Sequence, residues 1–506
     1  MMPLHDILLD AAARHPDRRA VAFGDRAMSY AEIRQAVDAL ANDLCNAGVQ
    51  AGDRVALLDE NSLEYPIVVF AVSIIGAVFV PVNFRYAPDE VAYVVNDSMP
   101  AVLLFSATFE AKVAAAKNGF TAPTKTLSLP TAEALLLRAP LTARPVEILD
   151  DETTAMVMYT SGTTGFPKGA LLSHRAYLAN VDAIAAAGDL TERDRMLVSM
   201  PLFHNGGLIA LLMPALRRGA LAVILGRGFD PDRVLSIVED EAITTTMWVP
   251  TMLAMILESG AQTRFDISCL KKIWYGSSPI APDLYARVRA EFGADLYQFY
   301  GMTETGMTSV LRPEDHALHP QGTGRAMAPA VLRLVDEAGA DVPLGAVGEL
   351  ISKQFPLGMT GYLGRQDATR KTVCDGWIYT GDMARNLGGG YFVLVDRKSD
   401  MIISGAENVY PREIENVLAA HPDVAEVAVF GIPDPIYGEA VCAAVVCKEG
   451  ARVSEDMLMA ECGARVAGYK KPKRILFKKN LPRNAAGKVM KHKLRAPFWA
   501  ERERAI

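Results

Sequence analysis

The sequence has few of the patterns that stabilise secreted, metal-folded or membrane proteins. Its six cysteines are scattered, with no Cys-x-x-Cys pair and no histidine at metal-ligand spacing, so we expect neither disulfides nor structural zinc. The longest apolar run, residues 67–80, contains Ser73 and Gly76 and stops at Pro81, which is too short for a membrane span. The first residues have no basic segment followed by an apolar one, so we expect a cytoplasmic protein. The cysteines are Cys45, Cys269, Cys374, Cys442, Cys447 and Cys462.

Acidic residues are missing from one long stretch of an otherwise acidic chain. The net charge of −7 argues against nucleic-acid binding. Residues 470–495 nevertheless contain eleven basic residues and no acidic one, which predicts a local polyanion such as the phosphates of a small ligand. A solvated basic face is the alternative interpretation. The basic residues are Lys470, Lys471, Lys473, Arg474, Lys478, Lys479, Arg483, Lys488, Lys491, Lys493 and Arg495.

Length and hydrophobic patterning predict two domains. A chain of 506 residues, 50% hydrophobic and 22% charged, is globular but too long for one core. Ser29 precedes a helical apolar register, Arg54 begins a short strand pattern, and this alternation continues to about residue 300, as is typical of α/β layers. Short strand patterns after residue 330 predict a small β-rich subdomain. We therefore expect an α/β fold with a large domain at 1–398, built of layered α/β subdomains plus the β-rich one, and a small, mobile α+β domain at 399–506.

Hydroxyl side chains and glycines are concentrated in residues 159–169, Tyr-Thr-Ser-Gly-Thr-Thr-Gly-Phe-Pro-Lys-Gly. Backbone N–H groups and hydroxyls of such a loop can surround phosphate oxygens, because glycine permits the close approach that a nest requires. The Gly-Lys-Ser/Thr ending of a P-loop is missing, so an ordinary P-loop NTPase is not indicated. We expect a phosphate loop of another kind, with a polar surface turn as the alternative.

A second cluster, residues 298–306, carries groups that suit a nucleotide. Tyr300 offers a flat face for a purine, Thr303 a hydroxyl for a phosphate oxygen, and Glu304 an oxygen of the kind that magnesium prefers. Alone, this cluster could also be a strand end followed by a capped helix.

Three charged residues later in the chain suit the remaining parts of a nucleotide complex. Asp382 and Arg397 lie at turns, where a carboxylate can accept from paired ribose hydroxyls and a guanidinium can donate to the same oxygens. Lys488 follows Gly487 in the basic segment. A lysine in such a loop is usually only solvated, so each of these features is weak evidence alone.

The fixed order of these segments resembles the adenylate-forming superfamily, which contains acyl-CoA synthetases, firefly-type luciferases and peptide-synthetase adenylation domains. The motifs Tyr-Thr-Ser-Gly-Thr-Thr-Gly-x-Pro-Lys-Gly and Tyr-Gly-Met-Thr-Glu carry the resemblance, which extends over essentially the whole chain. It implies an ATP- and magnesium-dependent acid–CoA ligase that forms an acyl-adenylate and then passes the acyl group to coenzyme A. It also makes a homodimer possible.

The resemblance implies a role for each motif residue. Residues 160–165 and Lys168 bind the triphosphate, residues 276–278 with Tyr300 hold adenine, and Asp382 with Arg397 binds the ribose. Thr303 binds the α-phosphate, Glu304 binds magnesium, and Lys488 bridges the acid carboxylate and the α-phosphate during adenylation. The implied nucleotide-binding residues are Thr160, Ser161, Gly162, Thr163, Thr164, Gly165, Lys168, Gly276, Ser277, Ser278, Gln298, Tyr300, Gly301, Met302, Asp382 and Arg397.

The resemblance identifies the residues of the domain hinge and of the CoA site less specifically. The hinge position is Ser399, where the family more usually has Asp or Lys, and Ala406 stands where a second glycine is common beside Gly405 in the pantetheine tunnel. The implied CoA-binding residues are Arg85, Gly405, Ala406, Tyr437 and Lys473.

The acid-binding residues are mostly aromatic or apolar. Phe299 precedes Tyr300 where malonate-specific relatives carry an arginine, and His204 corresponds to a position beside the acyl carboxylate. We therefore expect a fatty, aromatic or alicyclic monocarboxylic acid. The expected pocket residues are Trp248, Tyr275, Phe299 and Met307.

Three other functions share parts of this pattern. An adenylating enzyme that loads an acyl group onto a carrier protein shares the first half-reaction, but the basic C-terminal segment favours a phosphorylated acceptor. A luciferase-like oxygenase also adenylates its substrate, and nothing in the sequence favours it. A catalytically dead protein of this fold would be expected to have lost Lys488, Glu304 or Lys168, and all three are present.

The role implied for Lys488 predicts that the two half-reactions can be separated. Lys488→Ala should lower acyl-adenylate formation by about a hundredfold or more, because one contact to charge developing in the transition state is lost. Thioesterification of a supplied acyl-adenylate should change little. Equal loss in both half-reactions, measured by pyrophosphate release and by thioester formation, would contradict this role.

Overall fold

The computed structural model describes residues 3–139, 150, 152–160, 167–278, 280–320, 322–398, 400–404, 407–435, 437–451, 453–483 and 489–500. The chain forms two compact units, one of Met1–Leu332 with Ile351–Thr380 and one of Arg333–Leu350 with Gly381–Ile506. The boundary expected at residue 398 remains a prediction, and it falls inside the second of these units.

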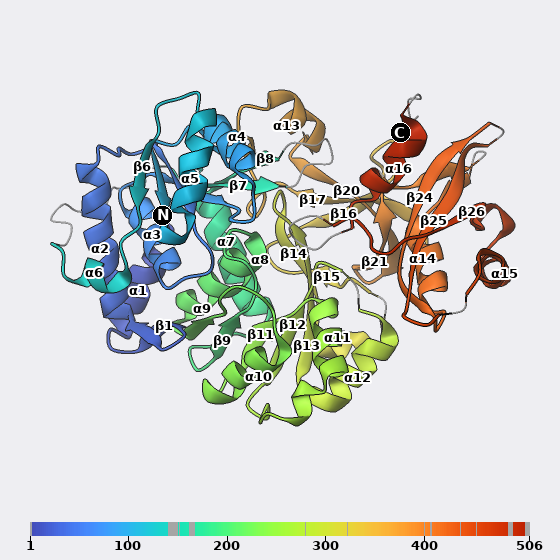
Figure 1. The fold of residues 1–506 in the computed structure, drawn as a ribbon, viewed down its shortest axis with the longest axis horizontal. Coiled ribbons are helices and arrows are strands. Elements are labelled where there is room, and N and C mark those ends of the chain that lie inside the picture. Colours follow the sequence, from blue (N-terminus) through green and yellow to red (C-terminus); the bar gives the residue numbers. More distant parts are fainter. Residues whose placement is uncertain are drawn as a thin grey trace. The chain divides into compact units, whose positions relative to one another are not determined.

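Two largely parallel sheets form the first unit (Figure 1). The larger sheet, as far as the structure describes it, runs in the order β15 (Arg325–Ala326), β14 (Gly306–Leu311), β13 (Asp295–Met302), β12 (Lys272–Tyr275), β11 (Thr245–Met247), β9 (Arg195–Val198), β10 (Leu221–Ile224), β1 (Arg19–Phe23) and β2 (Arg26–Ser29). The smaller sheet runs β18 (Gly361–Tyr362), β8 (Lys168–Ser173), β7 (Thr154–Thr160), β4 (Val78–Val82), β3 (Arg54–Leu58), β5 (Val102–Phe105) and β6 (Lys125–Ser128).

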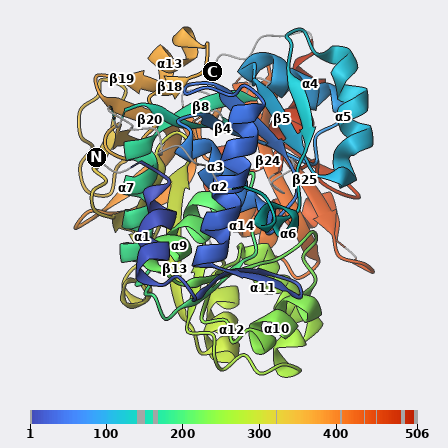
Figure 2. The same cartoon turned by 90° about the vertical axis from the view of Figure 1, so that its left-hand side faces the viewer.

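Helices fill the space between these sheets and cover their outer faces. The central core contains side chains from both sheets together with α1 (Asp6–Arg14), α2 (Tyr30–Asn46), α3 (Glu64–Ile74), α7 (His174–Ala187), the π-helical turn η3 (Leu208–Leu212) and α9 (Met213–Arg218). The short helix α8 (Asn205–Gly207) immediately precedes η3. The outer face of the smaller sheet carries α4 (Pro88–Ser98) and α5 (Glu110–Ala116), which lie beside β5 in Figure 2. The outer face of the larger sheet carries α10 (Pro231–Asp240), α11 (Pro250–Ser259) and α12 (Pro282–Phe292). Shorter helices are η1 (Ala107–Phe109), η2 (Lys117–Gly119), α6 (Ala132–Leu136), η4 (Ala261–Thr263), η5 (Pro313–Ala317) and α13 (Gln366–Thr372).

Local sequence signals explain two of the central helices. Ser29 caps α2 as predicted, because its hydroxyl accepts from the Glu32 N–H while the Glu32 carboxylate accepts from the Ser29 N–H. The long apolar run at 67–80 folds as most of α3 followed by the start of β4, and both elements are buried throughout. In the part of the chain that the structure describes, no helix has the length and hydrophobicity that a membrane crossing needs.

The remaining strands form two smaller sheets. One corresponds to the predicted β-rich subdomain and contains β16 (Leu332–Val335), β17 (Val347–Lys353), β20 (Trp377–Gly388), β19 (Val373–Cys374) and β21 (Tyr391–Arg397). The other contains β23 (Glu407–Val409), β22 (Ile402–Ser404), β25 (Gly438–Cys447), β24 (Val424–Asp434) and β26 (Arg474–Phe477). One face of this last sheet packs on α14 (Pro411–Ala419) and α15 (Glu455–Arg465), and the other packs on α16 (Lys491–Trp499), with the turn η6 (Gly468–Lys470) before β26. The predicted α/β layers, β-rich subdomain and α+β C-terminal part are confirmed.

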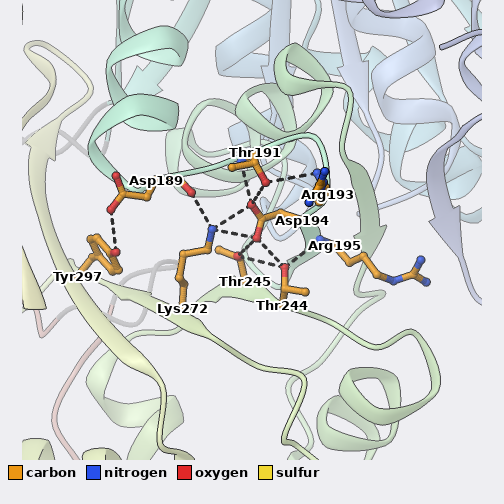
Figure 3. Close-up of polar contacts among 9 residues, drawn as sticks. All are labelled: Asp189, Thr191, Arg193, Asp194, Arg195, Thr244, Thr245, Lys272 and Tyr297. Atoms are coloured by element: carbon orange, nitrogen blue, oxygen red, sulfur yellow. Dashed lines mark hydrogen bonds and ion pairs between the residues drawn. The ribbon is translucent and has the colours of Figure 1, made fainter.

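A buried carboxylate fixes the amino ends of three parallel strands of the larger sheet. Asp194 immediately precedes β9 and is 7% exposed. It accepts a hydrogen bond from the Lys272 ammonium of β12 at 2.9 Å (Figure 3). It also accepts from the hydroxyls of Thr244, just before β11, and Thr245, the first residue of β11, at 2.8 and 3.0 Å. The N–H and hydroxyl of Thr191 donate to its second oxygen at 2.8 and 2.9 Å. All three strands therefore begin next to the Asp194 carboxylate.

The hydrogen bonds outweigh burial in setting the charge state of Asp194. Burial alone would raise its pKa, but the bonds from Lys272, Thr191 and Thr244 leave the pKa lowered from 3.8. A carboxyl whose pKa is lowered by folding stabilises the fold above its unfolded pKa, and this contribution is lost as pH falls through the folded value.

Asp194→Ala should lower the free energy of unfolding by about 3–5 kcal/mol, because it leaves the Lys272 ammonium buried without its carboxylate. Asp232→Ala is a matched control, since it removes a carboxylate from an exposed pair with Arg264 and should cost less than about 1 kcal/mol. Denaturant unfolding at neutral pH measures both. Equal losses in the two variants would show that the network does not carry the stability we assign to it.

Candidate active site

The turn after β12 carries the residues expected to bind adenine. Gly276 has no room for a side chain, because a Cβ there would lie 2.7 Å from the carbonyl oxygen of Phe299. Ser277 has φ +66, a left-handed conformation that is uncommon for a residue with a side chain, and Ser277 and Ser278 are both exposed. This strained turn stands at the carboxyl end of a parallel strand, where ligands usually bind in open α/β sheets.

The 298–306 cluster is a tight antiparallel connection between β13 and β14, not the helix start that the alternative interpretation allowed. A Cβ at Gly301 would lie 2.2 Å from the carbonyl oxygen of Gly306, so the two strands can approach only because residue 301 is glycine. The Met302 N–H donates to the Thr305 hydroxyl at 3.2 Å and closes the turn. The half-buried Thr303 lies between them at the tip, and Tyr300 is half-buried on β13.

Glu304 is a buried carboxylate with an identified partner. It is 9% exposed, and its Oε1 accepts from the Tyr362 hydroxyl at 2.8 Å. Its Oε2 has no hydrogen-bond partner among the described residues. The backbone carbonyl of Glu304 accepts from the Met359 N–H at 2.8 Å, so the turn is also held through the main chain.

Both ends of the expected phosphate loop lie on one hairpin. Thr160 is the last residue of β7 and pairs with Lys168, the first residue of β8. The Lys168 ammonium lies 5.2 Å from the centre of the Tyr362 ring. The loop residues between these ends, Ser161, Gly162, Thr163, Thr164 and Gly165, lie outside the described residues.

The two residues expected to bind ribose form an ion pair within the second unit. Asp382 of β20 and Arg397 of β21 are register partners, and Arg397 Nε lies 2.6 Å from Asp382 Oδ1. The Asp382 side chain is 8% exposed and the Arg397 side chain 32%. The structure therefore brings this pair together.

The residues expected to line the acid pocket lie on both faces of the larger sheet. Phe299 and Met307 pack with the central core, and the Phe299 ring lies 5.2 Å from that of Trp274. Tyr275 and Trp248 face the opposite side, because successive residues of a strand point to opposite faces. The structure thus does not gather these four side chains into one group, and their role as one pocket remains a prediction.

Hydrogen bonds satisfy the polar group of Tyr275 on the outer face. The Tyr275 hydroxyl lies 2.9 Å from Gln298 Oε1 and 2.9 Å from His316 Nε2. All three residues are buried, which makes them a closed network within the larger sheet's outer layer. Trp248 is fully buried and contacts the Phe292 ring edge-on at 5.9 Å.

His204 is exposed and caps the start of α8, between Leu202 and Leu208 of the central core. Its Nδ1 accepts from the Gly206 N–H at 3.1 Å, so the proton of the neutral ring is on Nε2. His204 can therefore donate from Nε2 to a ligand oxygen.

Two asparagines that the sequence analysis missed hold the site loops in place. The buried Asn180 of α7 donates to the carbonyls of Ala176 and Leu357 and accepts from the Met307 N–H, all at 2.8 Å. Asn61, which follows β3, donates to the Met200 carbonyl and accepts from the Leu202 N–H, and thereby holds the loop that leads to His204. A lone asparagine carries no motif, so sequence reasoning had no signal for either residue.

Two cations, Arg85 and Arg227, lie over the aromatic ring of Phe84, and a third, Lys112, binds the backbone beside it. The guanidinium carbons of Arg85 and Arg227 lie 5.4 and 6.0 Å from the ring centre. Lys112 donates to the carbonyls of Phe84 and Tyr86, at 2.6 and 2.8 Å, so it holds the backbone on both sides of Arg85. Sequence reasoning missed Lys112 and Arg227, because they come from α5 and from the chain after β10.

The charge of Arg227 acts on the two cations beside it. Burial first, and the charge of Arg227 second, lower the pKa of Arg85 and of Lys112. None of the described carboxylates lies within ion-pair distance of the Arg227 guanidinium. A bound anion would relieve this repulsion, so the group has the electrostatics of an anion site.

The C-terminal residues expected at CoA are placed in part. The Lys473 ammonium lies 4.0 Å from the centre of the Tyr437 ring and 3.1 Å from Asp434 Oδ2, so these two predicted residues meet. The Lys470 ammonium pairs with Glu413 at 2.7 Å. The predicted hinge, tunnel and adenylation residues Ser399, Gly405, Ala406 and Lys488 lie outside the described residues.

Comparison with known proteins places this chain among enzymes of known chemistry. Residues 8–363 match the model of the AMP-binding enzyme family, and residues 413–488 match the AMP-binding enzyme C-terminal domain. A feruloyl-CoA synthase from Amycolatopsis sp. is 39% identical over 96% of this chain and 97% of its own. An indoleacetate–CoA ligase from Aromatoleum aromaticum is 38% identical over 96% of each chain. The ATP-bound crystal structure of MatB from Rhodopseudomonas palustris has a TM-score of 0.91 at 30% identity and covers 99% of both chains.

Proposed function

The chain belongs to the AMP-binding enzyme family and is an ATP-dependent carboxylic acid–CoA ligase, and on that basis we propose that its acid carries an aromatic ring. In the first half-reaction a carboxylate oxygen attacks the α-phosphorus of ATP, and pyrophosphate leaves. In the second the sulfur of CoA attacks the acyl carbonyl, and AMP leaves. The acid, ATP and CoA are thus its small-molecule partners.

The choice of an aromatic acid among the fatty, aromatic and alicyclic classes rests on two observations. The feruloyl-CoA synthase and the indoleacetate–CoA ligase are both named for acids with an aromatic ring. Phe299, which packs on Trp274, and Met307 are aromatic and thioether side chains on the central side of β13 and β14, and such groups suit a flat ring. His204 is our candidate for donating to the acid carboxylate.

We propose the following residues for binding the nucleotide. Residues 276–278 and Tyr300 would hold adenine, Thr303 the α-phosphate, and the Thr160–Lys168 hairpin the β- and γ-phosphates. Asp382 would accept from the ribose hydroxyls, with Arg397 oriented beside it by their ion pair. Domain alternation, a homodimer and a cytoplasmic location remain predictions.

Glu304 is the residue we propose for magnesium. Magnesium is usually held by one or two carboxylates together with substrate phosphates, and it neutralises charge on those phosphates when bound. Glu304 fits this requirement, because one of its oxygens is oriented by Tyr362 and the other has no described partner.

The test is AMP release from ATP and magnesium over a panel of aryl, fatty and alicyclic acids, with and without CoA, with thioesters identified by mass spectrometry. Aryl acids should give CoA-dependent AMP and a matching aryl-CoA. A preference for fatty acids would contradict the proposed acid class. Adenylate without thioester would favour the alternative in which a carrier protein or another acceptor receives the acyl group.

Arg85, Arg227 and Lys112 form the proposed site for a phosphate of CoA. Arg227→Gln should raise the KM for CoA by about tenfold or more, because one charge-assisted hydrogen bond is lost. Acyl-adenylate formation should be unchanged. The KM ratio between dephospho-CoA and CoA should fall toward one if the 3′-phosphate is the bound group.

Arg264→Gln is the matched control for this substitution, because Arg264 pairs with Asp232 at the surface. It should leave the KM for CoA within about twofold of the unmodified enzyme. If Arg227→Gln behaves like Arg264→Gln, Arg227 does not take part in CoA binding.

A further inference from the structure

A short segment, residues 359–363, joins the Glu304 turn to the strand that begins with Lys168. The Met359 N–H donates to the Glu304 carbonyl, and the Leu363 N–H donates to the Gly169 carbonyl, both at 2.8 Å. Between them, β18 pairs with β8 through Tyr362 and Ala170. The main chain thereby brings together two phosphate-handling elements that lie more than a hundred residues apart in sequence.

Tyr362 contacts both of these elements with its side chain. Its hydroxyl donates to Glu304 Oε1 at 2.8 Å, while its ring lies beneath the Lys168 ammonium, 5.2 Å from the ring centre. The residue is 8% exposed, and its own N–H donates to the Thr369 hydroxyl at 2.9 Å. All of these residues belong to the first unit.

The two contacts reinforce each other physically. A hydroxyl that donates to a carboxylate makes the phenol ring richer in electrons, and the ring face then attracts a cation more strongly. A phenolic hydroxyl carries its proton at neutral pH, so Tyr362 is the donor in its bond with the Glu304 carboxylate. The bond holds one Glu304 oxygen and leaves the other available to a cation.

We propose that Tyr362 is a positioning residue for adenylation: its hydroxyl orients the metal-binding carboxylate of Glu304, and its ring holds the Lys168 ammonium toward the phosphates of ATP. This inference rests on the proposed function, which supplies the roles of Glu304 and Lys168. Tyr362 itself touches neither substrate nor metal.

Tyr362→Phe separates the two contacts, because it removes the hydroxyl and keeps the ring. The matched control is Tyr297→Phe, which removes another tyrosine hydroxyl that donates to a carboxylate, Asp189 Oδ2 at 2.9 Å, at the far end of β13 (Figure 3). Tyr362→Leu removes both contacts of Tyr362.

The first measurement is Mn²⁺ binding to the enzyme in the presence of a non-hydrolysable ATP analogue. The electron paramagnetic resonance signal of free Mn²⁺ reports how much metal is bound. We expect Tyr362→Phe to weaken Mn²⁺ binding by about tenfold or more, as is typical when a partner of a metal ligand is removed. Tyr297→Phe should bind Mn²⁺ as the unmodified enzyme does. Tyr362→Leu should also weaken binding of the analogue itself, measured without metal, because Lys168 loses its ring contact.

The second measurement is acid-dependent ATP–pyrophosphate exchange over a Mg²⁺ titration. Tyr362→Phe should shift the half-saturating Mg²⁺ concentration upward by about the same factor and leave thioesterification of a supplied acyl-adenylate unchanged. Mn²⁺ binding by Tyr362→Phe equal to that of Tyr297→Phe would overturn the proposal. So would an equal fall of both half-reactions together with the melting temperature, which indicates a purely structural role.

The two proposals can fail separately. If the unmodified enzyme forms neither adenylate nor thioester with any acid, the proposed function fails. The Mn²⁺ measurement needs no acid and no turnover, so it still decides whether Tyr362 orients Glu304.

Discussion

The buried ion pair between Asp194 and Lys272 is the constraint on which the rest of the first unit depends. It holds the amino ends of β9, β11 and β12 at one point, with Thr244 and Thr245 completing the shell (Figure 3). Because these strands are parallel, their carboxyl ends all lie at the opposite end of the sheet. The turns that follow them, including residues 276–278, are therefore presented together at that end.

Short-range contacts of three side chains hold the loops of the candidate site in position. Asn61 holds the loop before His204, Asn180 holds the start of β14, and Tyr362 joins Glu304 to Lys168. Each of these buried polar side chains makes its hydrogen bonds to the backbone or to one defined partner. The hydrogen bonds fix a single position for each loop and offset the free-energy cost of burying a polar group.

Charge is distributed differently over the parts of the nucleotide and CoA sites. In the proposed ribose pair, Asp382 and Arg397 orient each other. Around Phe84, by contrast, Arg85 and Arg227 both lie over one ring, and the charge of Arg227 lowers the pKa of Arg85. A preformed ion pair orients a ligand's hydroxyl groups, whereas neighbouring cations attract a phosphate, so the two arrangements suit different parts of the substrates.

The sequence by itself determined the local elements and the chemistry. The Ser29 cap, the strand at Arg54, the C-terminal α+β pattern and the family motifs need only neighbouring residues to be recognised, because caps, periodicity and glycine-rich turns act over a few positions. Only the tertiary structure decided which side chains meet. Gln298 and Tyr275 form a closed network on one face of the sheet while Phe299 faces the other, and Arg227, Lys112 and Tyr362 reach the site residues from distant segments. Such contacts depend on the order of the strands and on the face of the sheet where each side chain lies. Neither can be inferred from a short segment of the sequence.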